Sequence, residues 1–394
     1  MIKNIFQSKF VFFFTAALAI SLLVSCGGNG EKQPAGGNDK KAVKKTVIKI
    51  GLIGPLTGDI AAMGQGMKNG ATLAIEQANE RPEAKEKNIE FRLFPVDDRG
   101  DPKEAVNGAN QLISDPNVMG VVGHLNSGCS IPASQVYAKK DMVMISPAST
   151  NPKLTLQGLP NVFRVCTTDN VQGSFAADYL YNDQQVRNVA VIHDKTPYGQ
   201  GLAEEFQKRF EADGGKILSF NGVQLGDKDF KALLTRIKGS KPEIIYFGGM
   251  YQEGGLMIKQ AKELGITGIL MGGDGIFSPE FIKVGGAATE GTLASMIGAP
   301  PELIPSAQAF IESYKTKYPN TAFQPYDAYT YDATAMIVDA VLNVGKDRKA
   351  IVDYIRNVNY SGVIGDTKFD ENGDTLNKII TIYIVKEGNF VPMD

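Results

Sequence analysis

Several residues that could do chemistry stand together in residues 123–130, "GHLNSGCS", directly after the apolar run "VMGVV". The stretch holds a histidine, a cysteine and two serines at the place where a buried strand should end. Such a set could supply a nucleophile with its base, as in a hydrolase. It could equally supply a cradle of backbone amides for an anion, as at the N-terminus of a helix. The first interpretation predicts an enzyme, and the second predicts a binding protein.

The enzyme interpretation needs a nucleophile, a base and a group that orients the base. Ser127 or Cys129 would attack, with His124 or His193 as the base. His193 ends the apolar run "VAVIH", so it could face the same crevice as His124. A hydrolase elbow reads G-x-S-x-G, but Leu125 stands where the first glycine belongs. Since no orienting acid or oxyanion motif can be assigned, we predict that the protein is not an enzyme and has no catalytic residue.

The other polar motifs do not have the spacing of metal or nucleotide sites. Two separated histidines and few cysteines give no zinc pattern. The stretch "DENGDT" starts like a calcium loop, but Thr375 replaces the required glycine and Thr381 replaces the closing glutamate. There is no phosphate-binding lysine loop and no G-x-G-x-x-G. We therefore predict neither a metal nor a cofactor, and we interpret the glycines of "GLIGPLTGD" as turn residues at the mouth of a crevice.

The stretch "GHLNSGCS" also has the features of a helix N-terminus. Its small hydroxyl and amide residues suit capping positions, and we expect Pro132 to lie within the first helical turn. The free N–H groups and the dipole at such an end attract an anion, for example a carboxylate. Capping without any ligand is the alternative, and the stretch alone does not decide between the two.

A second polar loop favours the ligand. Residues 146–155, "SPASTNPKLT", follow the next apolar run, and open α/β sheets bind ligands at the carboxyl ends of their strands. Together with Ser127, this loop would offer the side chains of Ser149 and Thr150 and the carbonyl of Ala148. These groups provide donors and acceptors without net charge, a combination that suits a zwitterion.

The elements that must position these loops alternate between strand and helix from Thr46 onward. Strands are expected at "TVIKIGLIG", "IEFRLFPVDD", "VMGVVGH", "MVMISPA" and "NVAVIHD". Helices are expected at "GQGMKNGATLAIEQANE", "DPKEAVNGANQLIS", "GQGLAEEFQKRFEADGG" and "KDFKALLTRIKGSKP". In the first helix, one face carries Met67, Ala71, Ala74, Ile75 and Ala78. The alternation predicts an α/β fold with parallel sheets, and the length favours two doubly wound lobes.

Local signals refine two of these elements. Asp101 is the expected N-cap of the second helix, with Pro102 at its first position and Glu104 at the spacing of a capping box. Near the end of the chain, "FDENGD" is expected to turn between "GDTKF" and the strand "NKIITIYIV". This predicts a hairpin-like closing element.

The N-terminal segment has the pattern of a secretory signal. Lys3 and Lys9 precede the apolar run "FVFFFTAALAISLLV", and "LVSC" ends at Cys26. A transmembrane anchor is the alternative, but the run is short for a span. "LVSC" resembles the lipobox of bacterial lipoproteins, which implies cleavage before Cys26 and acylation of its thiol. Residues 1–25 would then be a signal peptide, and residues 26–46, rich in Gly and Lys, a flexible tether.

Composition limits the partners. The chain has 394 residues with 41 basic and 43 acidic side chains, and no basic stripe stands out, so we expect no nucleic-acid partner. Cys129 and Cys166 would lie in an oxidising compartment, either as one disulfide or as two buried free thiols.

Nine stretches, in this order, carry a resemblance to a known family: "IGLIGPLTGDIAAMGQ", "DDRGDPKEAV", "VVGHLNSGCSIPAS", "MISPASTNPKLT", "VFRVCTTDNVQG", "VIHDKTPYGQGLA", "IIYFGGMYQEGG", "LMGGDG" and "FDENGD". From about Val47 to Val391 the chain resembles the branched-chain amino-acid-binding proteins of ABC importers, the Leu/Ile/Val-binding family within the type I periplasmic binding fold. By family topology, residues 47–168 plus 298–375 would form one lobe, and residues 169–297 plus 376–394 the other, with a hinge between them.

The resemblance also implies roles for single residues. Ser127 and the amide of Thr150 would hold the ligand α-carboxylate, and the carbonyl of Ala148 and the hydroxyl of Thr150 would take the α-ammonium. Tyr198 would close over the ligand, and Asp274 would be the acidic partner of the ammonium. The remaining predicted ligand-binding positions are Met63, Met250, Asn126 and Ser149. The two methionines fall where family members can carry aromatic residues, and they predict an apolar ligand side chain.

We therefore expect an exported, lipid-anchored, monomeric binding protein that traps an aliphatic amino acid between two lobes and delivers it to the permease subunits of an ABC transporter. The alternative is a tethered binding or sensory protein of the same fold for an amide, urea or another small polar ligand. An acid at Asp274 favours the amine, because an unpaired buried ammonium would cost several kcal/mol.

Overall fold

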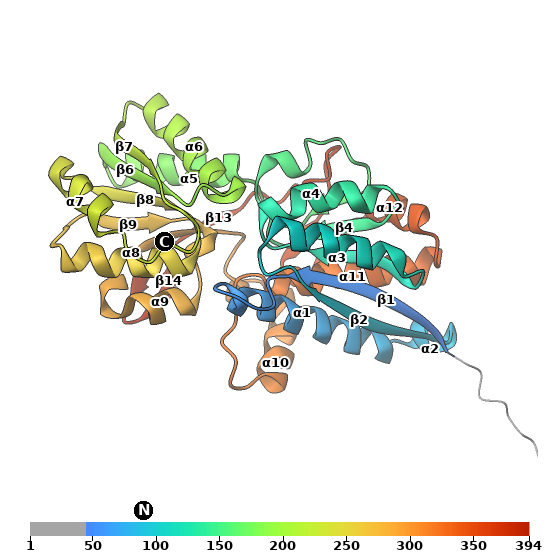
Figure 1. Cartoon of the computed structure of the whole chain (residues 1–394). Helices are drawn as coiled ribbons and strands as arrows, with labels where there is room; N and C mark the ends of the chain where they lie inside the picture. Colours follow the sequence, from blue (N-terminus) through green and yellow to red (C-terminus); the bar gives the residue numbers. More distant parts are fainter. Residues whose placement is uncertain (1–44, 394) are drawn as a thin grey trace, which may run out of the picture. The chain divides into compact units, whose positions relative to one another are not determined.

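The strand-like runs of the sequence form two separate sheets (Figure 1). The computed structural model describes residues 45–393, which lie in one compact unit, Lys44–Asp394. The predicted signal peptide 1–25, Cys26 and nearly all of the tether 26–46 lie outside the described residues. Within the described part, no helix has the length and apolar character needed to cross a membrane.

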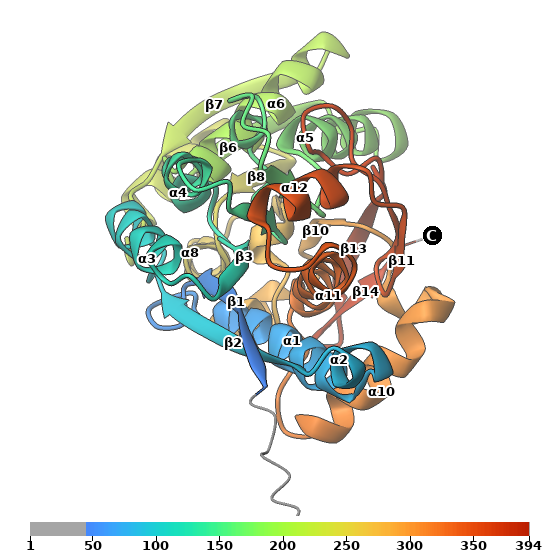
Figure 2. The ribbon, with the colours of Figure 1, turned by 90° about the vertical axis from the view of Figure 1, so that its right-hand side faces the viewer.

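The first sheet has five parallel strands in the order β2-β1-β3-β4-β5. Side chains alternate between its two faces, so Leu52 packs with helices α1 and α11, whereas Ile53 packs with α3 and α4. Figure 2 shows this sheet with helices on both sides. Its strands are β1 (Thr46–Gly54), β2 (Ile89–Asp97), β3 (Val118–Gly123), β4 (Val143–Ser146) and β5 (Val162–Arg164). Its helices are α1 (Ala61–Glu80), α2 (Pro82–Glu86), α3 (Pro102–Ser114), α4 (Ser127–Ala138), α11 (Asp327–Val344) and α12 (Arg348–Arg356).

The second sheet has seven strands in the order β14-β13-β10-β9-β8-β6-β7. Strands β6 to β10 are parallel, whereas β13 runs antiparallel to both β10 and β14. Figure 1 shows α5 and α6 on one side of this sheet and α8 and α9 on the other. Its strands are β6 (Asn188–His193), β7 (Lys216–Gly222), β8 (Ile244–Gly248), β9 (Ile269–Gly272), β10 (Leu293–Ile297), β13 (Ile380–Lys386) and β14 (Asn389–Pro392). Its helices are α5 (Asp169–Asp178), α6 (Pro197–Ala212), α7 (Lys231–Ser240), α8 (Tyr251–Glu263) and α9 (Pro279–Gly285).

The remaining elements are short. They are α10 (Gln308–Lys317), β11 (Tyr360–Gly362), β12 (Gly365–Thr367), the π-helical turn η2 (Tyr179–Asp183) and the 3₁₀ turns η1 (Pro152–Leu154), η3 (Asp274–Ile276), η4 (Gly286–Thr289), η5 (Pro301–Leu303) and η6 (Pro305–Ala307). The chain leaves the first sheet after β5, returns after β10, and passes to the second sheet again before β13. We call the parts built on the two sheets the first and second lobes. The α/β fold with two doubly wound lobes is confirmed.

Most of the expected elements are present, and the predicted face of α1 is buried. Asp101 caps α3 as predicted, because its carboxylate accepts hydrogen bonds from the N–H groups of Lys103 and Glu104. The reciprocal half of a capping box is not used. The N–H of Asp101 donates instead to the carbonyl of Asp98, in the turn that leads into the helix.

One local expectation is wrong, and another is met only in part. Pro132 lies in the second turn of α4 rather than in the first, and the N-cap residue Asn126 makes no side-chain capping bond. At the end of the chain, the expected turn closes only a short hairpin with one antiparallel bridge, between Phe369 and Thr375, because β12 pairs with β11, and β13 pairs with β10 and β14. The turn within it is confirmed, since the carboxylate of Asp370 accepts hydrogen bonds from the N–H groups of Asn372 and Asp374.

Candidate ligand-binding site

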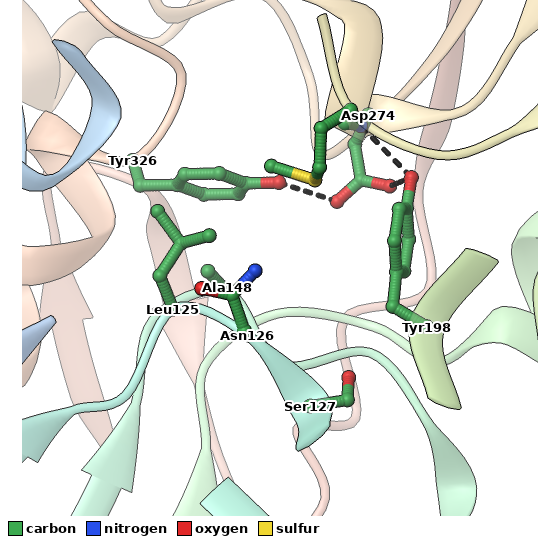
Figure 3. A pocket seen from close by; sticks show the side chains of 9 residues that line it. Leu125, Asn126, Ser127, Ala148, Tyr198, Asp274 and Tyr326 are labelled. Atoms are coloured by element: carbon green, nitrogen blue, oxygen red, sulfur yellow. Dashed lines mark hydrogen bonds between the residues drawn. The ribbon is translucent and has the colours of Figure 1, made fainter. Parts of the chain in front are cut away.

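A pocket lies between the two lobes, where loops from both sheets meet (Figure 3). About 230 Å³ inside it is free of protein atoms. Most of its wall comes from loops that follow β3, β4, β6, β8 and β9, the carboxyl ends of parallel strands, as expected for an α/β site. The lining residues are Leu125, Asn126, Ser127, Ala148, Tyr198, Met250, Asp274, Gly275 and Tyr326.

Serine hydroxyl groups fix the turn between β3 and α4 on the first lobe. The hydroxyl of Ser146 donates to the carbonyl of His124 at 2.9 Å, and that of Ser149 donates to the carbonyl of Leu125 at 2.9 Å. Ser130 and Ser149 share a further hydrogen bond at 2.6 Å. These contacts hold the backbone at the start of α4 rigidly beside the pocket.

Ser127, the first residue of α4, is the hydroxyl residue of this turn that lines the pocket. By helix geometry, its N–H group and that of Gly128 have no acceptor within the helix. Its hydroxyl accepts a hydrogen bond from the N–H of Asn151 at 3.2 Å, which joins the two loops of the first lobe. A hydroxyl and a free N–H at a helix N-terminus together form a suitable site for a carboxylate.

Apart from Ser127, the residues of the enzyme interpretation are engaged elsewhere. Both ring nitrogens of buried His124 have partners, the carboxylate of Asp98 at 2.7 Å and the hydroxyl of Tyr137 at 3.1 Å. His193 accepts a hydrogen bond from the N–H of Lys195 and does not line the pocket. Cys129 is buried, and burial raises the pKa of its thiol, so it is a poor nucleophile. The predicted alternatives for the cysteines are also resolved, because Cys129 and Cys166 are both free and buried.

The second lobe contributes a carboxylate. Asp274 is buried, and its two oxygens accept hydrogen bonds from the hydroxyls of Tyr198 at 2.8 Å and Tyr326 at 2.6 Å. The N–H of Gly275 donates to the hydroxyl of Tyr198 at 2.9 Å. Figure 3 shows Asp274 held between the two tyrosines and facing the wall that carries Ser127. Since Tyr326 directly precedes α11 of the first lobe, its bond to Asp274 links the lobes directly.

Burial raises the pKa of Asp274, and the two tyrosine hydroxyls oppose that shift. Burial and the neighbouring Asp274 in turn raise the pKa values of Tyr198 and Tyr326, which keeps both tyrosines neutral donors. A buried carboxylate is costly unless a positive charge compensates it. The hydrogen bonds that its oxygens accept come from the neutral hydroxyls of Tyr198 and Tyr326.

Six of the nine predicted site residues line the pocket, and the other three are buried next to its lining residues or in the core. Asn126, Ser127, Ala148, Tyr198, Met250 and Asp274 line the pocket. Met63, Ser149 and Thr150 are fully buried and do not line it. Thr150 still lies close to the site, in the loop that follows Ala148, and its hydroxyl has no hydrogen-bond partner among the described residues.

Sequence analysis missed three lining residues, Leu125, Gly275 and Tyr326. Leu125 and Gly275 are direct neighbours of predicted site residues, and their place in strand-end loops was a usable signal. Tyr326 comes from "QPYDAYT", a stretch with no motif that points to the pocket. Among residues 45–393, no group of His, Cys, Asp and Glu side chains has the arrangement of a metal site.

Comparisons with known proteins agree with this architecture. Residues 47–389 match the model of the family described as periplasmic binding protein. A Leu/Ile/Val-binding protein homologue of Brucella suis is 37% identical over 331 residues, which cover 83% of this chain and 87% of the relative.

Two solved structures show the same fold. A leucine-binding protein from Thermotoga maritima has 33% identity and a TM-score of 0.81 over 88% of this chain and 98% of the other. A branched-chain amino-acid transporter substrate-binding protein from Streptococcus pneumoniae, in complex with isoleucine, has 26% identity and a TM-score of 0.79 over 88% of this chain and all of the other. The two-lobed fold, the interlobe pocket and these matches show that the chain belongs to the periplasmic binding protein family, alongside the Leu/Ile/Val-binding proteins.

Proposed function

We propose that this protein binds an aliphatic, branched-chain L-amino acid between its lobes and delivers it to the permease of an ABC transporter. The observation that carries the proposal is that one side of the pocket suits an anion and the opposite side carries an acid. The first lobe presents the N-terminus of α4 with Ser127, and the second lobe presents the buried carboxylate of Asp274. An α-amino acid has a carboxylate for the first wall and an ammonium for the second.

Each ligand group has candidate partners. The hydroxyl and N–H of Ser127, with the N–H of Thr150, would bind the carboxylate. The carbonyl of Ala148, the hydroxyl of Thr150 and the carboxylate of Asp274 would accept the three N–H groups of the ammonium. Apolar contacts from Leu125 and Met250, which line the same pocket, would surround an aliphatic side chain. The names of the relatives, Leu/Ile/Val-binding and leucine-binding, support this ligand class.

The lobe boundaries belong to the same proposal. Residues 47–168 plus 298–375 and residues 169–297 plus 376–394 would move as two bodies about the three segments that connect the sheets. A ligand that touches both lobes stabilises the closed arrangement by its differential affinity for it. The family description as periplasmic supports export, and "LVSC" supports a lipid on Cys26. We further propose that the protein acts as a monomer.

Calorimetric titration tests the ligand. Residues 27–394, which include the whole compact unit, would be unfolded and refolded to remove amino acids carried over from the expression host. We expect leucine, isoleucine or valine to bind with a dissociation constant of about 1 μM or tighter, a free energy of about 8 kcal/mol or more. Asp274→Ala should abolish this binding and leave the circular dichroism spectrum unchanged.

Acetamide and urea serve as controls for the alternative ligand class. A response to either of them, with none to any amino acid, would retain the fold but refute the proposed ligand. Affinity close to wild type in Asp274→Ala would show that the ammonium lies elsewhere.

A further inference from the structure

Asp169 is a buried acid that the proposed ligand contacts do not use. It is the first residue of α5, at the point where the chain enters the second lobe, and its N–H donates to the carbonyl of Thr150 at 2.9 Å. Its side chain is fully buried, and neither carboxylate oxygen has a hydrogen-bond partner among the described residues. A buried acid without a partner is costly and uncommon, so its position calls for a physical reason.

The nearest candidate partner is Thr150. Its hydroxyl is also fully buried and also unpartnered within residues 45–393, and it lies near enough to Asp169 to favour the ionised form of that carboxyl. Each of these two side chains therefore has unused hydrogen-bonding capacity, and the backbone bond from Asp169 to Thr150 keeps the two residues adjacent.

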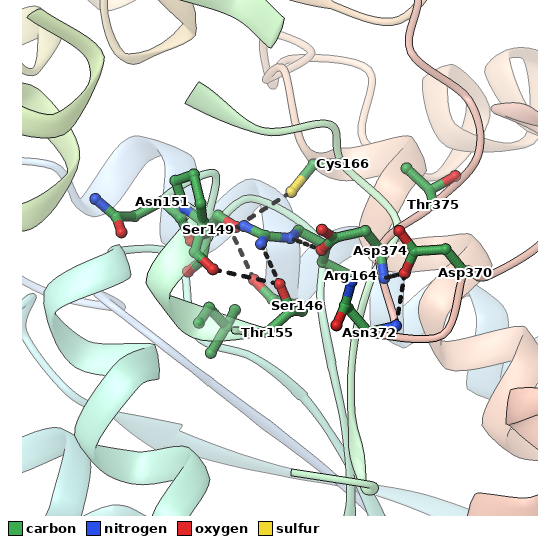
Figure 4. Close-up of polar contacts among 12 residues, drawn as sticks. Ser146, Ser149, Asn151, Thr155, Arg164, Cys166, Asp370, Asn372, Asp374 and Thr375 are labelled. Carbon is green, nitrogen blue, oxygen red and sulfur yellow. Dashed lines mark hydrogen bonds and ion pairs between the residues drawn. The ribbon is translucent and has the colours of Figure 1, made fainter. Parts of the chain in front are cut away.

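The loop that carries Thr150 is held rigidly by Arg164 (Figure 4). The guanidinium of Arg164 donates to the carbonyls of Ser149 and Asn151, both at 2.9 Å, and pairs with the carboxylate of Asp374. Because Asp374 already balances the charge of Arg164, this cation is not free to neutralise Asp169.

Several other groups face Asp169 from the elements packed around it. Asp274 of η3 and Glu205 of α6 add negative charge, and Arg164 of β5 adds positive charge. Tyr198 of α6 and Tyr246 of β8 are neutral phenols whose pKa values are raised by burial and by the charges of Asp274 and Asp169. Burial, with Asp274 and Glu205, raises the pKa of Asp169, and the hydroxyl of Thr150 and the charge of Arg164 oppose the shift.

The hydroxyl of Thr150 can accept one hydrogen bond from the ligand and donate another, and Asp169 is a candidate acceptor for the second. A hydroxyl that accepts an N–H from an ammonium still has its own proton to donate. Asp169, whose backbone N–H bonds the carbonyl of Thr150, has carboxylate oxygens without a partner among the described residues. We propose that Asp169 is a positioning residue for amine recognition: it accepts the hydroxyl proton of Thr150, aims the oxygen of Thr150 at the ligand ammonium, and gives up its own proton when the ligand binds. This inference rests on the proposed function, because it requires a ligand with an ammonium group.

The sign of the resulting pH dependence follows from the charges. Without ligand, burial keeps Asp169 protonated up to a higher pH than an exposed acid. The positive charge of a bound ammonium lowers this pKa again, so binding releases a proton to solvent at any pH between the bound and free values. Within that window, affinity rises with pH, by up to about tenfold per pH unit for one proton.

Calorimetry in two buffers tests the inference. Residues 27–394 would be titrated with L-leucine at about pH 7 in phosphate and in Tris, whose protonation enthalpies differ strongly. We expect the binding enthalpy of wild type to depend on the buffer, in the amount required by the release of a fraction of a proton. Asp169→Asn, which cannot ionise at this position, should release fewer protons than wild type, so its binding enthalpy should depend less on the buffer and its affinity should rise less with pH.

Asp332→Asn is the matched control. Asp332 is equally buried, burial raises its pKa to about 7, and its carboxylate accepts hydrogen bonds from the N–H groups of Val363 and Ile364, outside the pocket. Proton release should survive in this variant. A second measurement covers the case in which Asp169→Asn does not fold: the infrared band of a protonated carboxyl group should diminish when leucine is added to wild type.

The outcomes separate the two proposals. A wild-type enthalpy independent of buffer, or undiminished proton release in Asp169→Asn, would overturn the role of Asp169 while leucine binding stands. An unchanged carboxyl band in the infrared spectrum would do the same. Failure of every amino acid to bind would instead contradict the proposed function itself.

Discussion

Ser127 and Cys129 lie two positions apart on α4, yet they face different surroundings. Ser127 lines the pocket, whereas Cys129 packs into the apolar core behind it with Tyr137 and Met144. The helical turn separates a side chain that can touch a ligand from one that cannot. Within the stretch "GHLNSGCS", the residue that suits the binding interpretation therefore lies at the pocket, and the cysteine that suits the enzyme interpretation lies in the core.

Substitution of the two residues should give opposite results. Ser127→Ala removes a hydrogen bond to the ligand carboxylate, which is worth about 1.5–3 kcal/mol, so affinity for leucine should fall about 10- to 100-fold. Cys129→Ala should leave affinity unchanged and lower only stability. Titration calorimetry on residues 27–394 measures the affinities, and thermal unfolding measures the stability. A loss of binding in Cys129→Ala with normal binding in Ser127→Ala would revive the nucleophile hypothesis.

Site residues could be predicted from sequence when they follow a strand directly. Ser127, Ala148 and Asp274 belong to such loops, and strand ends can be located from apolar runs. Tyr326 could not be predicted in this way, because it reaches Asp274 from the other lobe across 52 positions of sequence. No local pattern encodes which residue of one lobe will approach the other.

At the scale of elements, capping determines where α3 begins. Asp101 satisfies two N–H groups of its first turn, and Pro102 occupies the first helical position, where no N–H is needed. The turn before this helix also holds Asp98, because the N–H of Asp101 donates to its carbonyl, and the carboxylate of Asp98 binds the ring of His124. His124 lies in the turn that leads to Ser127. The cap of α3 thus helps to fix the turn of the first lobe that carries Ser127 at the pocket.

Asp101→Ala should lower the free energy of unfolding by about 1 kcal/mol, the usual value of an N-cap. Urea unfolding of residues 27–394 measures the change. Lys103→Ala, a substitution at an exposed position of the same helix, is the control and should have little effect. Equal stability of the Asp101 variant and wild type would show that solvent replaces the cap without cost.

Strand existence was easier to predict than strand pairing. The β-rich run of β13 has a clear pattern of its own, but its partners are set by the open edge of β10 and by the return of the chain through β14. Both neighbours are fixed by tertiary structure. The predicted hairpin is confined to the bridge between Phe369 and Thr375, and it does not include β13, whose partners are β10 and β14.

At the scale of the whole molecule, the proposed anchor makes a separate prediction. If Cys26 carries the lipid, the full chain should incorporate a labelled fatty acid and sediment with membranes, and Cys26→Ser should do neither. Metabolic labelling followed by fractionation measures both properties. Cys129→Ala is the matched control and should keep the label, because its thiol is buried in the fold. A label retained by Cys26→Ser would place the modification at another residue.

The position of β13 between β10 and β14 also determines when the second lobe can be completed. Strands β6 to β10 are available early, but the partner of β10 starts at Ile380, after the whole return through α10, α11 and α12. Until then, one edge of β10 exposes unpaired backbone groups, and such edges recruit other chains. A chain that emerges N-terminus first therefore passes through an aggregation-prone stage near the end of its synthesis or transport, when protection by chaperones matters most.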